Sequence, residues 1–196
     1  MITPVATERL TLRGPVPLSH MIVRSCLRLG DTVIDATCGN GYDTLFLAES
    51  VGPDGQVWGF DIQQQAITET ERRVTEAGFS ARVNLILDGH QSLSQHITLP
   101  VQAVLFNLGY LPGGDRSIIT RPETTAPALD QSLTLLAPAG VLAITIYPGH
   151  SGGSDEQQTI ERWAAALKPR HYHSWRMAQN NVAADAPYLL FVQKVA

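Results

Sequence analysis

The stretch VIDATCGNGYDT, residues 33–44, decides the fold. Its apolar start ends in the carboxylate of Asp35, two glycines follow at Gly39 and Gly41, and a helical pattern covers residues 42–51. A strand, a glycine turn and a helix allow the backbone to approach a ligand closely and aim a helix N-terminus at it. This stretch therefore predicts the first unit of an α/β fold, with a ligand site at the turn.

A second apolar run, residues 56–61, ends in Asp61. In a βαβ unit this carboxylate lies beside the first glycine turn, where it can accept hydrogen bonds from both hydroxyls of a ribose. The two strand ends together predict a nucleoside-cofactor site.

Length and composition suit one soluble domain, residues 1–196, with 44% hydrophobic and 16% charged residues. No apolar run approaches the roughly 20 residues of a membrane-spanning helix, and the N-terminus lacks the pattern of a secretory signal. Cys26 and Cys38 are the two cysteines. They form no Cys/His cluster, so we expect a cytoplasmic protein without a metal or a disulfide framework.

The pattern of strands and helices predicts a three-layer, Rossmann-like α/β fold. An extended arm, residues 1–17, precedes a helix capped by Ser19. The further strands are expected at 82–87, 101–106 and 140–147, and the helices at 63–77, 122–137 and 154–168. Two last strands, near 170–177 and 187–194, have no helix between them. We therefore expect a seven-stranded, mostly parallel sheet in which the last strand is antiparallel.

Polar residues follow each of the first five strands, and ligands of open α/β sheets bind at this carboxyl edge. Loops ordinarily contain Gly and Asp, but five such ends in succession favour a site. Thr44 replaces the third glycine of a dinucleotide fingerprint, so S-adenosylmethionine, which has no phosphate, fits better than a dinucleotide. The predicted cofactor-binding residues are Asp35, Thr37, Gly39, Asn40, Gly41, Asp43, Asp61, Ile62, Gln63, Asp88, Gly89 and His90.

These residues have different expected roles. Asp35 or Asp43 would accept from the cofactor ammonium, although both could instead cap a helix. Asp61 suits the ribose, with Ile62 against the adenine face, and Asp88 suits the adenine amino group.

Five segments, DATCGNGYDTLFLA, FDIQQQAI, LILDGH, FNLGYLPGGDRSIIT and YPGHSGG, resemble in order and spacing a family of small class I methyltransferases formerly labelled putative rRNA methylases. The resemblance runs from about residue 15 to the C-terminus. It implies a class I methyltransferase fold, S-adenosylmethionine as cofactor, and tRNA 5-(aminomethyl)-2-thiouridine methyltransferase activity at the wobble position. Cys38 stands where a small residue such as alanine is expected. An rRNA or small-molecule methyltransferase on the same fold is the alternative.

An amine acceptor also suits the residues after the fourth strand. The Asn107 side chain and the Leu108 carbonyl can accept amine hydrogens and aim the nitrogen lone pair, and Tyr110 can stack on a base. This resembles the Asn/Asp-Pro-Pro-Tyr motif of amino methyltransferases, with Leu-Gly in place of Pro-Pro. His150 or His90 could serve as a base, with the wall of an adenine pocket as the alternative role of His90.

The predicted catalytic residues are Asn107, Tyr110 and His150, and the predicted substrate-binding residues are Leu108, Tyr147, Arg116, Arg121, Asn180 and Asn181. The expected partner is the anticodon stem-loop of a tRNA. A net charge of −4 gives no general attraction to RNA, so contacts would need a local basic patch. Such a run surrounds Trp175, from Lys168 to Arg176, although solvated surface charge is the more common explanation for any single residue in it. A homodimer is compatible with so small an RNA-binding domain.

A competing motif, GHSGG at residues 149–153, matches the G-x-S-x-G nucleophile elbow and would make Ser151 a hydrolase nucleophile. Only 43 residues follow Gly153, too few for the strands that normally carry the partner Asp and His. The hydrolase hypothesis also leaves Asp61 and Asp88 unexplained.

Overall fold

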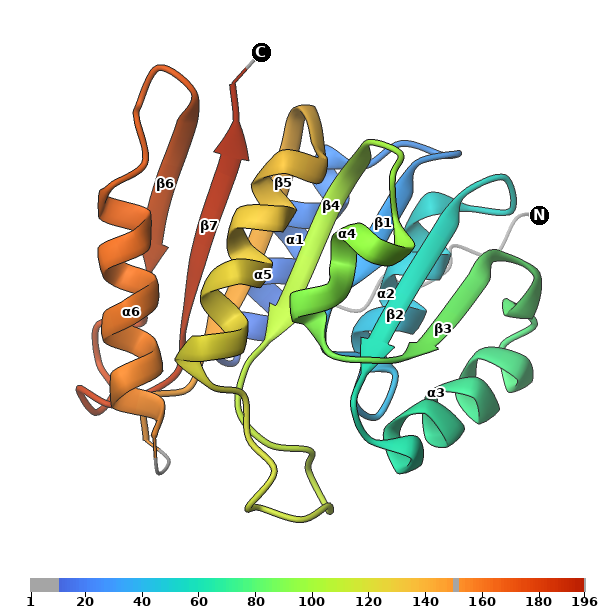
Figure 1. The fold of residues 1–196 in the computed structure, drawn as a ribbon, viewed down its shortest axis with the longest axis horizontal. Coiled ribbons are helices and arrows are strands. Elements are labelled where there is room, and N and C mark those ends of the chain that lie inside the picture. The colour runs from blue at the N-terminus through green and yellow to red at the C-terminus, as the bar shows by residue number, and fades with distance from the viewer. Residues whose placement is uncertain (1–10, 150–151, 196) are drawn as a thin grey trace, which may run out of the picture.

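Seven strands form one sheet in the order β3-β2-β1-β4-β5-β7-β6 (Figure 1) in the computed structural model, which describes residues 11–149 and 152–195. The strands are β1 (Thr32–Asp35), β2 (Gln56–Asp61), β3 (Val83–Leu87), β4 (Val101–Asn107), β5 (Leu136–Ile146), β6 (Tyr172–Met177) and β7 (Tyr188–Lys194). The helices are α1 (Pro15–Cys26), α2 (Tyr42–Val51), α3 (Gln64–Glu76), α4 (Leu93–His96), α5 (Pro122–Leu135) and α6 (Gly153–Ala165). Two short 3-10 helices, η1 (Ser80–Arg82) and η2 (His90–Ser92), precede β3 and α4.

Strands β1 to β5 are parallel, and β7 runs antiparallel to both of its neighbours, β5 and β6. The predicted fold class, with its antiparallel last strand, is confirmed. Because β6 is antiparallel to β7, it points in the same direction as the parallel strands. The loops that follow β1 to β6 therefore meet at one edge of the sheet, at the bottom of Figure 1.

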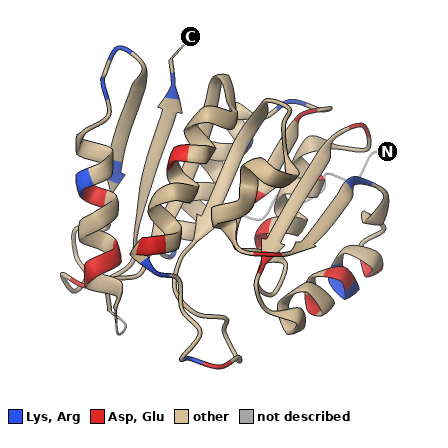
Figure 2. Cartoon of the chain, in the orientation of Figure 1, with Lys and Arg blue, Asp and Glu red and all other residues tan. Residues whose placement is uncertain are grey.

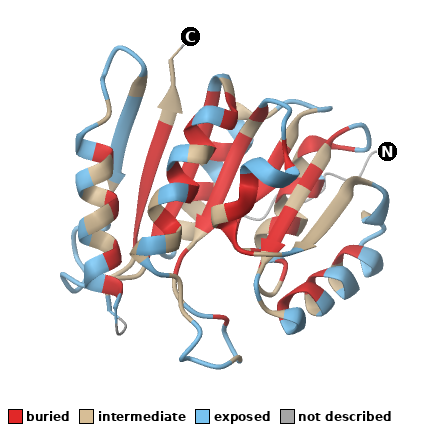
Figure 3. Cartoon of the chain, in the orientation of Figure 1, coloured by how far each residue is buried: buried red, intermediate tan, exposed pale blue. Residues whose placement is uncertain are grey.

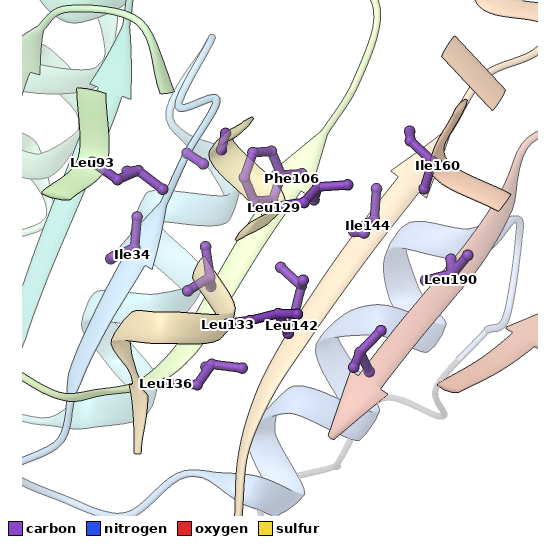
Figure 4. Packing of buried hydrophobic residues seen from close by; sticks show 14 of the residues in the cluster. Ile34, Leu93, Phe106, Leu129, Leu133, Leu136, Leu142, Ile144, Ile160 and Leu190 are labelled. Atoms are coloured by element: carbon purple, nitrogen blue, oxygen red, sulfur yellow. The ribbon is translucent and has the colours of Figure 1, made fainter. Parts of the chain in front are cut away.

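Helices cover both faces of the sheet because the central strands are apolar on both sides. Along β1, Val33 joins a cluster with residues of α1 and α2, and Ile34 joins the opposite cluster with residues of α4, α5 and α6. Successive side chains of a strand point to opposite faces, which gives this alternation. Figure 4 shows the second cluster, in which Phe106 of β4 packs near Leu129 of α5. The central strands are buried, and edge strand β6 is mostly exposed (Figure 3).

The first helix starts earlier than the sequence suggested. Prolines at positions 15 and 17 indicated an extended arm and a cap at Ser19, but α1 begins at Pro15 after Gly14. Proline is tolerated in the first helical turn, where its missing N–H has no partner to lose. The arm prediction is therefore wrong for residues 15–17, and residues 1–10 lie outside the described part of the chain.

The boundary between α5 and β5 also differs from the prediction. The helix ends at Leu135, and the strand starts at Leu136 rather than at residue 140. Val101 pairs with Leu136 before a register shift, and Ala103 then pairs with Val141. A step of two residues along β4 thus corresponds to a step of five along β5, an irregularity that lengthens β5 and that residue patterning does not encode.

Across residues 11–149 and 152–195, every helix is too short or too polar to cross a membrane.

Candidate active site

A cleft of about 960 Å³ opens at the carboxyl edge of the sheet. Its walls come from the loops after β1, β2, β3, β4 and β5, together with the start of α1. Most of the predicted site residues line it: Thr37, Gly39, Asn40, Asp43, Asp61, Ile62, Gln63, Asp88, Gly89, His90, Asn107, Leu108, Tyr110, Arg121 and Tyr147. The strand ends that are separate in sequence therefore form one cleft.

The glycine turn is bound directly to the second strand. The Gly39 amide donates a 3.0 Å hydrogen bond to Oδ2 of Asp61. Gly41, which precedes α2, has φ 81°, and a Cβ there would lie 3.0 Å from Cα and Oγ1 of Thr70 on α3. Both the backbone conformation and the contact with Thr70 require glycine at this position.

Asp61 keeps hydrogen-bonding capacity for a ligand. Oδ1 accepts from the Gln63 amide at 2.9 Å, and Oδ2 accepts from Gly39. Burial raises the pKa of Asp61, and these backbone bonds act against that rise. The Ile62 amide also stabilises the charged form, and a carboxylate has about four acceptor positions, so Asp61 keeps capacity to accept from a ribose hydroxyl.

His90 gives the most specific sign of a bound ligand. The residue is 8% exposed, it lines the cleft, and its Nε2 has no hydrogen-bond partner among the described residues. Burial lowers its pKa to about 4, so the ring is neutral at pH 7. A buried nitrogen without a partner is costly unless a ligand satisfies it. Its place beside Asp61, Ile62 and Asp88 fits the adenosine part of S-adenosylmethionine.

Asp88 has partners of its own at this end of the cleft. Oδ2 lies 3.0 Å from Nε2 of His96, and Oδ1 accepts from the Gly89 amide at 2.7 Å. These two bonds hold the pKa of Asp88 below its usual range. The carboxylate is therefore already oriented, with lone pairs left for an amino group.

The other end of the cleft is built around Asn107, the last residue of β4. Its backbone N–H donates to Oγ1 of Thr37 at 2.7 Å, and its Nδ2 donates to Oδ2 of Asp43 at 3.4 Å. Tyr147 lies beside them: burial, and next the charge of Asp43, raise its pKa, and a hydrogen bond with Asn107 acts against that rise. Asp43, Asn107 and Tyr147 thus form one polar cluster, here named the acceptor end.

Sequence reasoning missed His20, which also belongs to the acceptor end. It comes from α1, and its Nε2 lies 2.7 Å from Oδ1 of Asp43. The ring stacks on Phe46 of α2 with centroids 3.8 Å apart and planes 2° from parallel. No motif marks His20, because the contact joins a helix before the first strand to a residue 23 positions later.

The loop between β4 and α5 forms an ordered wall of the cleft. Gly109 exchanges hydrogen bonds with Thr120, from its amide to Oγ1 and from the Thr120 amide to its carbonyl, each 2.9 Å. Oγ1 of Thr120 in turn donates to the buried carboxylate of Glu156 on α6, at 2.7 Å. On the same loop, the Arg116 guanidinium lies 5.4 Å from the centre of the Tyr110 ring.

Several predicted site residues lie elsewhere. Asp35 is fully buried beneath the cleft, where it accepts from Oγ1 of Thr44 at 2.6 Å and from the Thr37 amide at 3.2 Å. Burial, and next the charge of Asp43, raise its pKa to about 8. Asp35 therefore does not line the cleft. It binds the residues on both sides of the glycine turn, Thr37 and Thr44.

The remaining residues fall outside the lining for other reasons. Gly41 and Arg116 lie next to it, and Asn180 and Asn181 occupy an exposed turn before β7. His150, and Ser151 of the competing motif, lie outside the described residues. Within the described ranges, no three His, Cys, Asp or Glu side chains are grouped as they would be to hold a metal ion.

The sheet order, with its antiparallel β7, and the cleft at the carboxyl edge are those of a class I methyltransferase that uses S-adenosylmethionine. Residues 57–193 match the family described as "Putative rRNA methylase", and the chain belongs to this family. This membership excludes the serine hydrolase alternative in favour of a methyltransferase.

Relatives and solved structures agree with this assignment. The chain is 36% identical over 187 residues to a chloroplastic tRNA (mnm(5)s(2)U34)-methyltransferase of Arabidopsis thaliana, covering 90% of this chain and 68% of that protein. A putative rRNA methylase from Clostridium thermocellum superposes with TM-score 0.92 at 42% identity, over 95% of this chain and 100% of that chain. A putative methyltransferase from Streptococcus mutans, in complex with SAH, superposes with TM-score 0.85 at 34% identity, over 94% and 100%.

Proposed function

We propose that this protein methylates the aminomethyl nitrogen of 5-aminomethyl-2-thiouridine at the wobble position of tRNA. The observation that carries the proposal is the acceptor end, where the Asn107 side chain lies between Asp43 and Tyr147 in the wall of the cleft. The similarity to the Arabidopsis enzyme, whose name states such an activity, supports the same choice.

The bound cofactor supplies a methyl group on a positively charged sulfur. Asp61 and His90 would hold its ribose and adenine, and the amides of the glycine turn would lie along it. Asn107 and the Leu108 carbonyl would accept N–H groups of the acceptor, which leaves the nitrogen lone pair directed into the cleft. An amine suits these acceptors because it offers N–H groups as well as a lone pair.

Arginine and aromatic side chains near the cleft support an RNA substrate. Arg121 lines the cleft, and Tyr110 with Arg116 provides a ring and a cation for base stacking and phosphate contact. Of the basic run, Lys168 and Arg170 precede β6, so they lie at the edge of the sheet opposite the cleft (Figure 2). These two residues are therefore not part of this candidate RNA surface.

The test uses purified protein, S-adenosylmethionine and two synthetic anticodon stem-loops, one with 5-aminomethyl-2-thiouridine at the wobble position and one with uridine. Mass spectrometry of the digested nucleosides should show one added methyl group on the aminomethyl nucleoside only. A third reaction with ribosomal RNA is the control for the family description. Methylation of the ribosomal RNA, with none on the aminomethyl stem-loop, would overturn the proposal.

A further inference from the structure

The carboxylate of Asp43 is held between side chains from two distant parts of the chain. His20 of α1 lies 2.7 Å from Oδ1, and the Asn107 amide nitrogen of β4 lies 3.4 Å from Oδ2. The Asp43 side chain is only 12% exposed, yet it lines the cleft. Its position is therefore fixed on one side by His20 and directed on the other toward the acceptor end.

His20 is suited to orienting this carboxylate. A carboxylate accepts hydrogen bonds, so Nε2 of His20 carries the hydrogen in this pair. The parallel stack on Phe46 fixes the plane of the imidazole ring, and the His20 side chain is 25% exposed. The ring thus acts as a rigid donor that keeps Oδ1 occupied and leaves Oδ2 for the cleft.

The acceptor end combines one negative charge with neutral polar groups. Asn107, Thr37 and Tyr147 are neutral, and the raised pKa of Tyr147 reports in part the charge of Asp43. A largely buried carboxylate gains most from a cation that also donates a hydrogen bond. At neutral pH an alkylamine with ordinary basicity is such a cation.

The same carboxylate favours the transfer itself. The bound ammonium first gives one proton to water, which frees the nitrogen lone pair. As this lone pair forms the bond to the methyl carbon, the carbon–sulfur bond breaks, the sulfonium becomes a neutral thioether, and positive charge returns to the nitrogen. A fixed negative group beside the reacting atom stabilises this charge more than it stabilises the neutral amine.

We propose that Asp43, oriented by His20, selects a cationic aminoalkyl acceptor over neutral acceptors and stabilises the charge that develops on its nitrogen. This rests on the proposed function, since it assigns the residues that recognise the amine. His20 is in this account a positioning residue, because it acts only through Asp43. The competing assignment, in which Asp43 binds the ammonium of the cofactor, is an outcome of the test.

The binding experiment compares two stem-loops that differ only in the group on C5 of the wobble uridine: one carries an aminomethyl group and the other a hydroxymethyl group. S-adenosylhomocysteine (SAH), the cofactor without its methyl group, is present so that no turnover occurs. The parent should bind the aminomethyl RNA at least about 10-fold more tightly, the scale of one hydrogen bond to a charged group. Asp43→Asn should reduce this preference to about 3-fold or less, because it removes the charge and keeps the shape.

Two variants of His20 separate its hydrogen bond from its ring stack. His20→Phe keeps a ring to stack on Phe46 and loses the donor, and His20→Gln keeps an N–H donor and loses the stack. The single-turnover methylation rate should fall by roughly 10²-fold in Asp43→Asn. It should fall by about 10-fold in His20→Phe and by no more than about 3-fold in His20→Gln, since a donor to Oδ1 is what the account requires. Thermal unfolding shows whether each variant is folded, and calorimetry measures its SAH affinity separately.

The outcomes are distinguishable. If the parent does not methylate the aminomethyl RNA, the proposed function fails and this inference fails with it. If the parent methylates that RNA but Asp43→Asn keeps the full preference, the inference is wrong and the function stands. Loss of SAH affinity in Asp43→Asn, with the RNA preference unchanged, would assign Asp43 to the cofactor and overturn the inference. Equal methylation rates in His20→Phe and the parent would show that His20 does not position Asp43 for the reaction.

Discussion

The two ends of the cleft are constructed in different ways. At the end of the cleft that contains Asp61, Asp88 and His90, here named the cofactor end, the carboxylates accept from backbone amides. Asp61 accepts from Gln63 two residues later and from Gly39 22 residues earlier, and Asp88 accepts from Gly89 one residue later. At the acceptor end, side chains meet from far apart: Asn107 contacts Asp43 across 64 positions. The cofactor end is thus formed by carboxylates bound to backbone amides of the strand-end loops, whereas the acceptor end is formed by side chains that bind one another across long sequence separations.

This contrast has a functional consequence. Changes at the cofactor end should alter cofactor affinity, and changes at the acceptor end should alter turnover with cofactor affinity preserved.

The largest effect is expected at Asp61. Asp61→Ala removes two charge-assisted acceptors for the ribose, so S-adenosylmethionine affinity should fall by about 2–4 kcal/mol. Calorimetry measures it, with Asp54→Ala, in the exposed turn before β2, as a carboxylate control. Unchanged affinity in Asp61→Ala, or tight NAD binding by the parent, would contradict the assignment of the cofactor end.

His90 should make the stability of the cofactor end depend on pH. Its pKa is lowered from 6.5 to about 4 by burial, so the folded and unfolded states both carry a neutral ring above pH 6.5. As the pH falls from 6.5 to 4, the unfolded state takes up a proton that the folded state does not. The free energy of unfolding therefore decreases, by up to about 3 kcal/mol.

His90→Phe should remove this decrease, as measured by urea unfolding at pH 7 and near pH 4. His173→Phe, at an exposed position on β6, is the matched control and should retain it. If His90→Phe and the parent lose stability in parallel on acidification, the ring is not buried in its neutral form.

The glycine turn between the two ends should show the smallest effect. Gly41→Ala places a Cβ at φ 81° and 3.0 Å from Thr70, and Gly78→Ala places one at φ 74° with nothing within 4 Å. Both variants place alanine in an unfavourable backbone conformation, so the difference between their free energies of unfolding reports the contact of the Gly41→Ala side chain with α3. Gly41→Ala should be less stable than Gly78→Ala by about 1 kcal/mol or more in urea unfolding. Equal stability would mean that α3 moves away without cost.

Much of the fold could be predicted from residue patterns. The apolar strands, the glycine turn and the missing helix before β7 predicted the mixed seven-stranded sheet. The start of α1 and the irregularity that lengthens β5 could not be predicted, since prolines fit both arms and first helical turns and such an irregularity has no periodic pattern.

The candidate site also contains residues that could be predicted from the sequence and residues that could not. Asp61 ends β2, and the residues from Asp88 to His90 directly follow β3. Because the carboxyl ends of parallel strands meet at one edge of the sheet, these residues could be predicted to lie together, and all of them line the cleft. His20 could not be predicted, because nothing before the first strand indicates which loop α1 will contact. Asp35 was predicted to contact the cofactor as part of the motif, but strand register places it below the cleft, bound to Thr44.

The most direct measurement of the separation compares Asn107→Ala with Asp61→Ala in two parallel assays: single-turnover methylation of an aminomethyl stem-loop at saturating cofactor, and calorimetry of cofactor binding. Asn107→Ala should reduce the single-turnover rate by roughly 10²-fold or more, as when one positioned polar group is lost from the transition state. Its cofactor affinity should change by less than about 1 kcal/mol, the range of one ordinary contact. Normal turnover in Asn107→Ala, or a loss of cofactor affinity as large as that of Asp61→Ala, would contradict the separation of the two ends.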